Sequence, residues 1–164
     1  MSQRSYASLT NEDLKRLRDI AARDRAEFFQ RNADTARLYA DNLFAVALCQ
    51  GAALHYLDGK NGIKDFDVWS FYKTNPERPF PYRRRGVLDF GDSKFGTTDD
   101  SPHFLGRRVD HIGRSIAADD YADPVAVLKR YLRSRATESA SCLAEKAMVL
   151  IEPLDLLGTI VWPE

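Results

Sequence analysis

Two short apolar segments in the first half of the chain favour β-strands, so the fold must contain a sheet. The segment LFAVALCQ covers residues 43–50, and the segment IKDFDVWSFY covers residues 63–72. The second is rich in β-branched and aromatic residues and is bounded by Gly62 and by Asn75-Pro76, as strands usually are. The first has the length of a buried strand, although its Ala and Leu content would equally suit a helix.

Helices are expected on both sides of these strands. Thr10 and Asp13 form a loose variant of the capping box, which predicts a helix from residue 11 to about residue 30. Asp123-Pro124 begins another helix that runs to about residue 135, since Pro is favoured in the first helical turn. The remaining expected elements are a short helix capped by Asp34, strands in GVLDF (86–90) and GRRVDHIGRSI (106–116), and a last helix at 139–146.

These elements predict one α/β (α+β) domain over residues 1–164, in which helices flank a small mixed β-sheet. We expect a helical N-terminal segment (1–42), a core (43–116) and C-terminal helices (117–164). A chain of 164 residues can bury a core without disulfides or structural metals.

Composition excludes several functional classes. Lys+Arg and Asp+Glu are both 24, so no net charge draws the whole protein to nucleic acid or to an anionic membrane. Cys49 and Cys142 lie far apart and the three histidines are scattered, which excludes a zinc-finger pattern. No apolar run approaches the ~20 residues of a membrane span, and the N-terminus is polar. We therefore expect a cytoplasmic protein that does not contact membranes.

Asp65 and Asp67 interrupt the second apolar segment with two carboxylates. On a strand, residues two apart point to the same face about 7 Å apart, so Phe66 and Val68 would then face the core. Carboxylates on one face repel each other, and a hard divalent cation such as Mg²⁺ relieves the repulsion. The alternative is that both aspartates lie on the solvent face of an edge strand.

A glycine lies upstream of this pair, where the first strand would end. Gly51 is followed by a short helix that we expect to begin at Ala52 or Ala53. A glycine at a strand-to-helix turn lets phosphate oxygens approach the backbone, and the N–H groups at a helix start favour an anion. The alternative is a glycine needed only for a tight turn.

Together, the segment CQGAALHYLDGKNGIKDFDVW resembles the nucleotidyltransferase fold of the DNA polymerase β-like superfamily, as a minimal member. That family combines an apolar strand, Gly followed by Gly or Ser, a short helix, and Asp-x-Asp on the next strand. A third carboxylate comes from a neighbouring strand, for which Asp110 in GRRVDHI is the candidate and Asp89 in GVLDFG the rival. The resemblance covers roughly residues 43–116. One departure is Ala52, where a Ser hydroxyl could have held a phosphate.

The resemblance implies a transfer of a nucleoside monophosphate from an NTP to a hydroxyl acceptor. Asp65, Asp67 and Asp110 would be the catalytic carboxylates that hold Mg²⁺ or Mn²⁺, and Asp110 would help to deprotonate the acceptor. The backbone of Gly51 and Ala52 would hold the outer phosphates. Lys64, or Lys60 beside it, would neutralise them. The acceptor is a small molecule, an RNA end or a protein side chain.

Two other interpretations remain open at this point. The loss of Ser at position 52 suggests a catalytically silent member of the fold that serves as a binding or toxin–antitoxin partner module. In a divergent fold, the aspartates would be surface residues.

Further residues allow a functional and a structural interpretation. Arg83, Arg84 and Arg85 beside Tyr82 could bind RNA phosphates, or they could form a solvated loop. His111 alternates to the face opposite Asp110, where we expect a buried, hydrogen-bonded imidazole. We also expect an inert core thiol at Cys49, and we expect Trp69, Phe71 and Tyr72 in the core or at the edge of a nucleotide pocket.

Overall fold

The computed structural model describes residues 4–81, 85–97 and 102–164. Its elements, in chain order, are α1 (Asn11–Arg31), α2 (Ala33–Tyr39), β1 (Leu43–Cys49), α3 (Gln50–Asp58), β2 (Phe66–Lys73), β3 (Arg85–Asp89), β4 (Arg108–Ile116), α4 (Pro124–Ser134), α5 (Glu138–Leu143), β5 (Met148–Glu152), the 3₁₀ turn η1 (Leu154–Leu156) and β6 (Ile160–Trp162).

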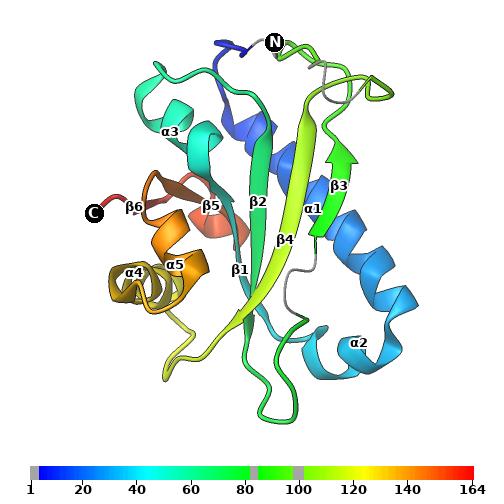
Figure 1. Ribbon diagram of the computed structural model, residues 1–164, viewed down its shortest axis with the longest axis vertical. Helices are drawn as coiled ribbons and strands as arrows, with labels where there is room; N and C mark the ends of the chain where they lie inside the picture. The colour runs from blue at the N-terminus through cyan, green and yellow to red at the C-terminus, as the bar shows by residue number, and fades with distance from the viewer. Residues whose placement is uncertain (1–3, 82–84, 98–101) are drawn as a thin grey trace.

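The strands form one mixed sheet in the order β3-β4-β2-β1-β5-β6. β2 and β4 are parallel neighbours, whereas the other adjacent strands pair antiparallel. The predicted α+β class with a mixed sheet and flanking helices is therefore confirmed. The parallel pair lies near the centre of the sheet, and β1 and β3 flank it (Figure 1).

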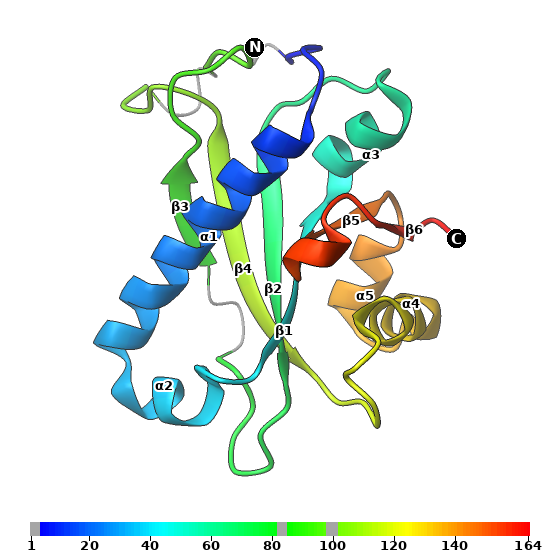
Figure 2. The same cartoon turned by 180° about the vertical axis from the view of Figure 1, so that it is seen from behind.

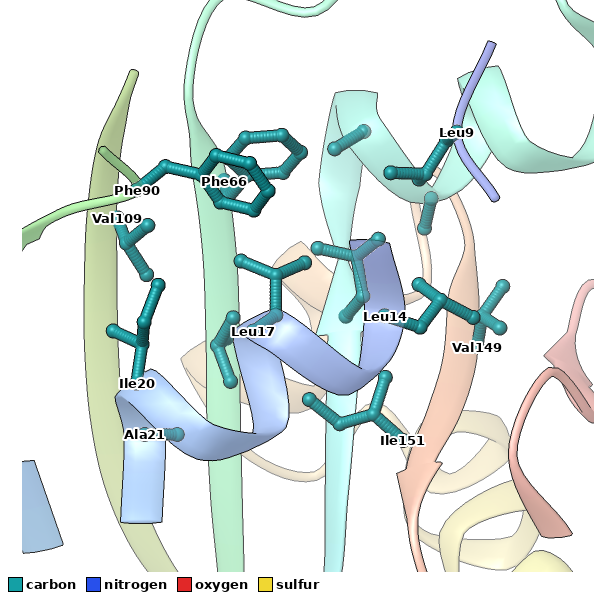
Figure 3. Packing of buried hydrophobic residues seen from close by; sticks show 14 of the residues in the cluster. Leu9, Leu14, Leu17, Ile20, Ala21, Phe66, Phe90, Val109, Val149 and Ile151 are labelled. Carbon is teal, nitrogen blue, oxygen red and sulfur yellow. The ribbon is translucent and has the colours of Figure 1, made fainter. Parts of the chain in front are cut away.

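Helix α1 covers one face of the sheet, as Figure 2 shows from behind. Its apolar side chains, among them Leu14, Leu17 and Ile20, pack on Phe66 of β2 and Val109 of β4 (Figure 3). Alternation along the strands explains this face, because Phe66 and Val68 are fully buried against α1, as the sequence predicted.

Helices α4 and α5 cover only part of the opposite face. They pack with β1 and β5 in a second core that includes Leu128, Leu132 and Leu143. In Figure 1, α4 and α5 lie on the side of β1 and β5, and within the described part of the chain no helix crosses the viewer's face of β4 and β3. This uncovered part of the sheet is where the candidate site lies.

Local signals account for most helix boundaries. The Thr10 capping box is present, with the hydroxyl accepting from the Asp13 N–H and the Asp13 carboxylate accepting from the Thr10 N–H. Asp123 and Thr137 accept from backbone N–H groups at the starts of α4 and α5. Such caps satisfy N–H groups that lack a partner within the helix.

Several expected boundaries differ from the structure. Helix α2 begins at Ala33 after Asn32, so Asp34 lies in its first turn and is not its cap. Helix α3 begins at Gln50, and α5 ends at Leu143. β2 begins at Phe66 because the preceding Ile63 pairs with Ser5 in both directions, at 2.8 and 2.7 Å, and leaves the ladder of β2. The C-terminal part holds β5 and β6 besides its helices, so the sheet continues beyond residue 116.

Candidate functional site

Two carboxylates meet where the parallel strands run side by side. The register of β2 and β4 pairs Asp67 with Asp110. Since Phe66 and Val109 face α1, alternation points both aspartates to the opposite, partly uncovered face. Neighbouring strands lie about 4.8 Å apart, so the two side chains are adjacent.

The surroundings of Asp67 disfavour its charge. Burial, followed by the charges of Asp65 and Asp110, raises the pKa of Asp67 from 3.8 to about 7. Arg85 and Lys146 act in the opposite direction but do not cancel these effects. A bound cation would reduce the cost of the charged form of Asp67.

Asp110 is buried, and the guanidinium of Arg108 on the same strand lies beside it. Its Oδ1 accepts hydrogen bonds from Nε and Nη2 of Arg108 at 3.0 and 2.9 Å. Arg108 lies two residues away and thus on the same face as Asp110. This ion pair explains how a buried carboxylate is tolerated next to Asp67.

Asp65 lies immediately before β2 and not on it. The expectation that strand alternation places Asp65 beside Asp67 is wrong in this respect, because the strand begins one residue later. Its charge nevertheless reaches the site, since it contributes to the raised pKa of Asp67. It also counteracts the lowering of the Arg107 pKa that burial causes.

Asp89, the rival third carboxylate, has a structural position. Its oxygens accept the backbone N–H groups of Gly91, Leu105 and Gly106 at 2.7–2.9 Å. Burial alone would raise its pKa, but these N–H donors lower it. Asp89 pairs with Arg108 in the β3–β4 register, whereas Asp110 is the residue next to Asp67.

The turn between β1 and α3 differs in detail from the expected one. The residue with a left-handed backbone is Gln50, at φ 64°, and not Gly51. A Cβ atom added to Gly51 would meet no atom within 4 Å, so no contact within the described chain requires a glycine there. Ala52 is buried. Because Cys49 pairs with Asp67 across β1 and β2, this turn lies next to the acidic pair.

Only some of the lysines and arginines that the sequence suggested lie near the acidic pair. The backbone oxygen of Lys64 accepts from Arg107 at 3.2 Å, and Lys60 is exposed. Arg83 and Arg84 lie outside the described residues. Arg85 begins β3, is exposed, and lowers the pKa of Asp67 through its charge. The RNA interpretation of the arginine segment stays a prediction.

Carboxylates are suitable ligands for a hard divalent cation, but the described residues limit the coordination set. Among them, no three or more His, Cys, Asp or Glu side chains form a group that could hold a metal ion. Asp67 and Asp110 form a pair. Mg²⁺ is commonly held by one or two protein carboxylates together with substrate phosphates and water. The pair therefore fits a Mg²⁺ ion that arrives with a nucleotide.

A cavity of about 1090 Å³ occupies the same face further along β2 and β4. The sequence left open whether Trp69 packs in the core or at the edge of a nucleotide pocket; its side chain packs against the second core and lines this cavity. The sequence did not indicate Arg114 on β4 or the α5 residues Ser139 and Cys142. No local pattern identifies them, because the packing of α5 beside β4 brings them together.

The opposite face carries a buried polar chain. The Nε2 atom of His111 shares a hydrogen bond with the Ser70 hydroxyl at 2.6 Å. Its Nδ1 atom donates to the Asp24 carboxylate at 2.7 Å. All three side chains are nearly inaccessible. The expectation that His111 is a buried, satisfied imidazole away from the acidic face is confirmed, and it ties α1 to the sheet. Cys49 is likewise fully buried.

Comparisons of the chain with family models, with curated proteins and with solved structures gave no match. Across the part of the chain that the structure describes, no helix combines the length and the apolar character needed to cross a membrane.

Proposed function

We propose that the protein is a nucleotidyltransferase that moves a nucleoside monophosphate from an NTP to a hydroxyl acceptor in the presence of Mg²⁺. The observation that carries this proposal is the parallel register that sets Asp67 beside Asp110 on the uncovered face of the sheet. The resemblance of the sequence around Gly51 and Asp67 to the DNA polymerase β-like superfamily supports the same assignment.

The topology around the acidic pair also supports the proposal. β1 pairs antiparallel with β2, the α3 segment connects them, and β2 pairs in parallel with β4. This arrangement sets the β1–α3 turn and both aspartates at one end of adjacent strands. A triphosphate at the turn would then have its phosphates next to Asp67.

The chemical step forms one bond and breaks another. The acceptor hydroxyl oxygen bonds to the α-phosphorus, the bond from that phosphorus to the bridging oxygen breaks, and pyrophosphate leaves. The acceptor proton passes to a carboxylate, for which Asp67 and Asp110 are adjacent candidates. Mg²⁺, when bound with the nucleotide, supplies charge neutralisation for the entering and leaving oxygens.

Each described side chain has a limited task in this scheme. Asp67 and Asp110 would hold the cation through their carboxylate oxygens. Arg108 holds Asp110 in place by its two hydrogen bonds. The Gln50 N–H donates to the Ala147 carbonyl at 3.1 Å, so the proposal assigns the outer phosphates to the N–H groups that follow it, where the open surroundings of Gly51 leave room.

A second candidate is a catalytically silent binding module with the same fold. Two observations favour it: the ion pair of Asp110 with Arg108, and the lack of a three-ligand metal group among the described residues. This candidate predicts nucleotide binding without turnover.

The test uses the full chain and the four NTPs, each labelled at the α-phosphate, with a cell extract as the source of acceptors. The proposal predicts a labelled product and released pyrophosphate that depend on Mg²⁺ and are lost in Asp67→Asn. Asp119→Asn is the matched control, because Asp119 is an exposed aspartate beyond the end of β4. Transfer of label in EDTA, or undiminished transfer by Asp67→Asn, would overturn the proposal. Binding without any transfer would favour the silent module.

A further inference from the structure

The cavity on the uncovered face has a lining suited to one small ligand. Its volume of about 1090 Å³ lies just above the ~300–1,000 Å³ of small-molecule pockets. Its walls come from β2, from β4, from Arg85 at the start of β3, from the segment that contains Phe80, and from α5. A pocket of this size holds a molecule of drug or nucleotide dimensions, not a folded domain.

Most of the lining is apolar, and an indole lies at its base. Trp69 is half-buried, and its ring stacks on Phe71 at a centroid distance of 6.1 Å. Phe80 and Ile112 add further apolar surface. Trp69 is held by its neighbours, so it presents a rigid surface on which a planar ring could stack at little entropic cost.

The charged groups in the lining favour an anion. Arg114 and Arg85 line the cavity, against one acidic residue, Glu138. The guanidinium of Arg114 is fixed, since Nη1 donates to the Ser139 hydroxyl at 3.3 Å and the group lies 5.9 Å from the Tyr131 ring centre. In the described part of the chain its Nε is buried with no hydrogen-bond acceptor, so its donors are not all used. Fixed guanidinium groups bind phosphate and carboxylate well.

The cavity lies on the same sheet face as the acidic pair, although neither aspartate lines it. Trp69 follows Asp67 by two residues on β2, and Ile112 follows Asp110 by two residues on β4, so each pair shares a face. Cys142, also in the lining, accepts a hydrogen bond from Gln50 at the start of α3 at 3.3 Å. A ligand in the cavity would therefore reach both the aspartates and the β1–α3 turn.

We propose that this cavity binds the acceptor of the transfer, and that the acceptor is a small aromatic molecule with an anionic group and a free hydroxyl. Its ring stacks on Trp69, and its phosphate or carboxylate pairs with Arg114. Its hydroxyl points along the strands toward Asp67 and Asp110. The ligand's role as acceptor rests on the proposed nucleotidyl transfer. The binding of an aromatic anion in the cavity does not depend on that proposal.

Cys142 provides a direct test of occupancy. The chain has two cysteines, of which Cys142 is exposed and Cys49 is buried, so a thiol reagent such as Ellman's reagent reports on Cys142. The probes are AMP and 4-hydroxyphenylacetate, which are two aromatic anions from different chemical sources. Each is compared with a neutral aromatic counterpart, adenosine or 4-methylphenol, and with an anion that lacks the ring, ribose 5-phosphate or acetate.

The expected result is that one aromatic anion slows the labelling of Cys142 at a concentration about tenfold below that of its neutral or ring-free counterparts, because ring and charge contribute together. Whether AMP or 4-hydroxyphenylacetate protects Cys142 better then shows whether the cavity prefers a phosphate or a carboxylate. Protection by a short RNA at lower concentration than AMP would overturn the small-molecule assignment. Equal protection by the neutral counterparts, or none by either anion at millimolar concentration, would overturn the inference.

Variants connect the protection to the named residues. Arg114→Gln should weaken protection about tenfold, while Arg114→Lys retains part of it and Arg130→Gln on α4 leaves it unchanged. Trp69→Leu should also weaken it, and thermal unfolding checks that each variant is folded. Undiminished protection in Arg114→Gln and Trp69→Leu would contradict the assigned contacts.

The two proposals fail in different ways. Protection should be at least as strong in Asp67→Asn, which removes a carboxylate of the proposed nucleotide site but no residue of the cavity lining. Protection without any binding of Mg²⁺ and NTP would sustain the cavity as an aromatic-anion site and reject the transferase. Nucleotide transfer without protection by either anion would sustain the transferase and reject the cavity as an aromatic-anion site.

Discussion

At the scale of single residues, Asp67 has the most unusual environment of the proposed site. It is a carboxylate on a central strand, and burial together with Asp65 and Asp110 keeps its pKa near 7. The alternation of apolar and acidic residues in the sequence correctly predicted which face Asp67 occupies. It could not reveal the ion pair of Asp110 with Arg108, since the distance between side chains depends on their rotamers and not on their spacing in the chain.

This environment predicts a pH dependence of stability. The pKa of Asp67 is higher in the folded protein (about 7) than its ordinary value of 3.8, so folding favours the protonated form. As pH rises from 3.8 to about 7, the free energy of unfolding therefore loses a contribution, roughly 1–4 kcal/mol in total. Asp67→Asn lacks this titration. Urea unfolding of both proteins across this range, without Mg²⁺, should show that the variant gains stability relative to the parent as pH rises. A constant difference between the two would contradict the pKa shift.

At the scale of elements, the parallel pair β2–β4 and helix α1 determine where the side chains go. The sequence predicted β2, β4 and α1, because each has a clear local pattern. It predicted neither β6 nor the start of β2, which depends on the pairing of Ile63 with the distant Ser5. For the same reason the cavity was not predictable: Arg114 and Cys142 meet only through the packing of α5 beside the sheet.

The buried chain from α1 to the sheet should contribute to stability. Ser70→Ala removes the buried hydroxyl that hydrogen-bonds His111 Nε2 at 2.6 Å. We expect the free energy of unfolding to fall by about 1–3 kcal/mol. Ser8→Ala, at an exposed serine before α1, should change it by no more than about 0.5 kcal/mol. Denaturant unfolding measures both, and equal small effects would show that the Ser70–His111 contact adds little.

The turn before α3 offers a test of the phosphate site. Gly51→Ala should not reduce stability, since its Cβ meets no atom within 4 Å. A glycine-to-alanine change inside a helix even adds about 0.5–1 kcal/mol. NTP affinity should nevertheless fall, because the methyl group occupies space that the phosphates would use. Thermal unfolding and nucleotide titration give the two readouts. A folded Gly51→Ala that binds NTP as tightly as the parent would remove this turn from the site.

At the scale of the whole molecule, α1, α2 and α3 pack on one face of the sheet, and α4 and α5 pack on part of the other. The remaining part of that second face carries the acidic pair at one end and the cavity along its length. A sheet face left open in this way exposes functional groups to a ligand while the two apolar cores keep the fold intact. Both proposals, for the nucleotide and for the acceptor, depend on this arrangement.

The central claim is that Asp67 and Asp110 bind a nucleotide together with Mg²⁺, and calorimetric titration with non-hydrolysable analogues of the four NTPs tests it most directly. The parent and Asp119→Asn should bind an analogue only when Mg²⁺ is present. Asp67→Asn should bind it at least about tenfold more weakly, because it loses a charged ligand of the cation. Binding by Asp67→Asn as tight as that of the parent, or binding by the parent that does not depend on Mg²⁺, would contradict the claim.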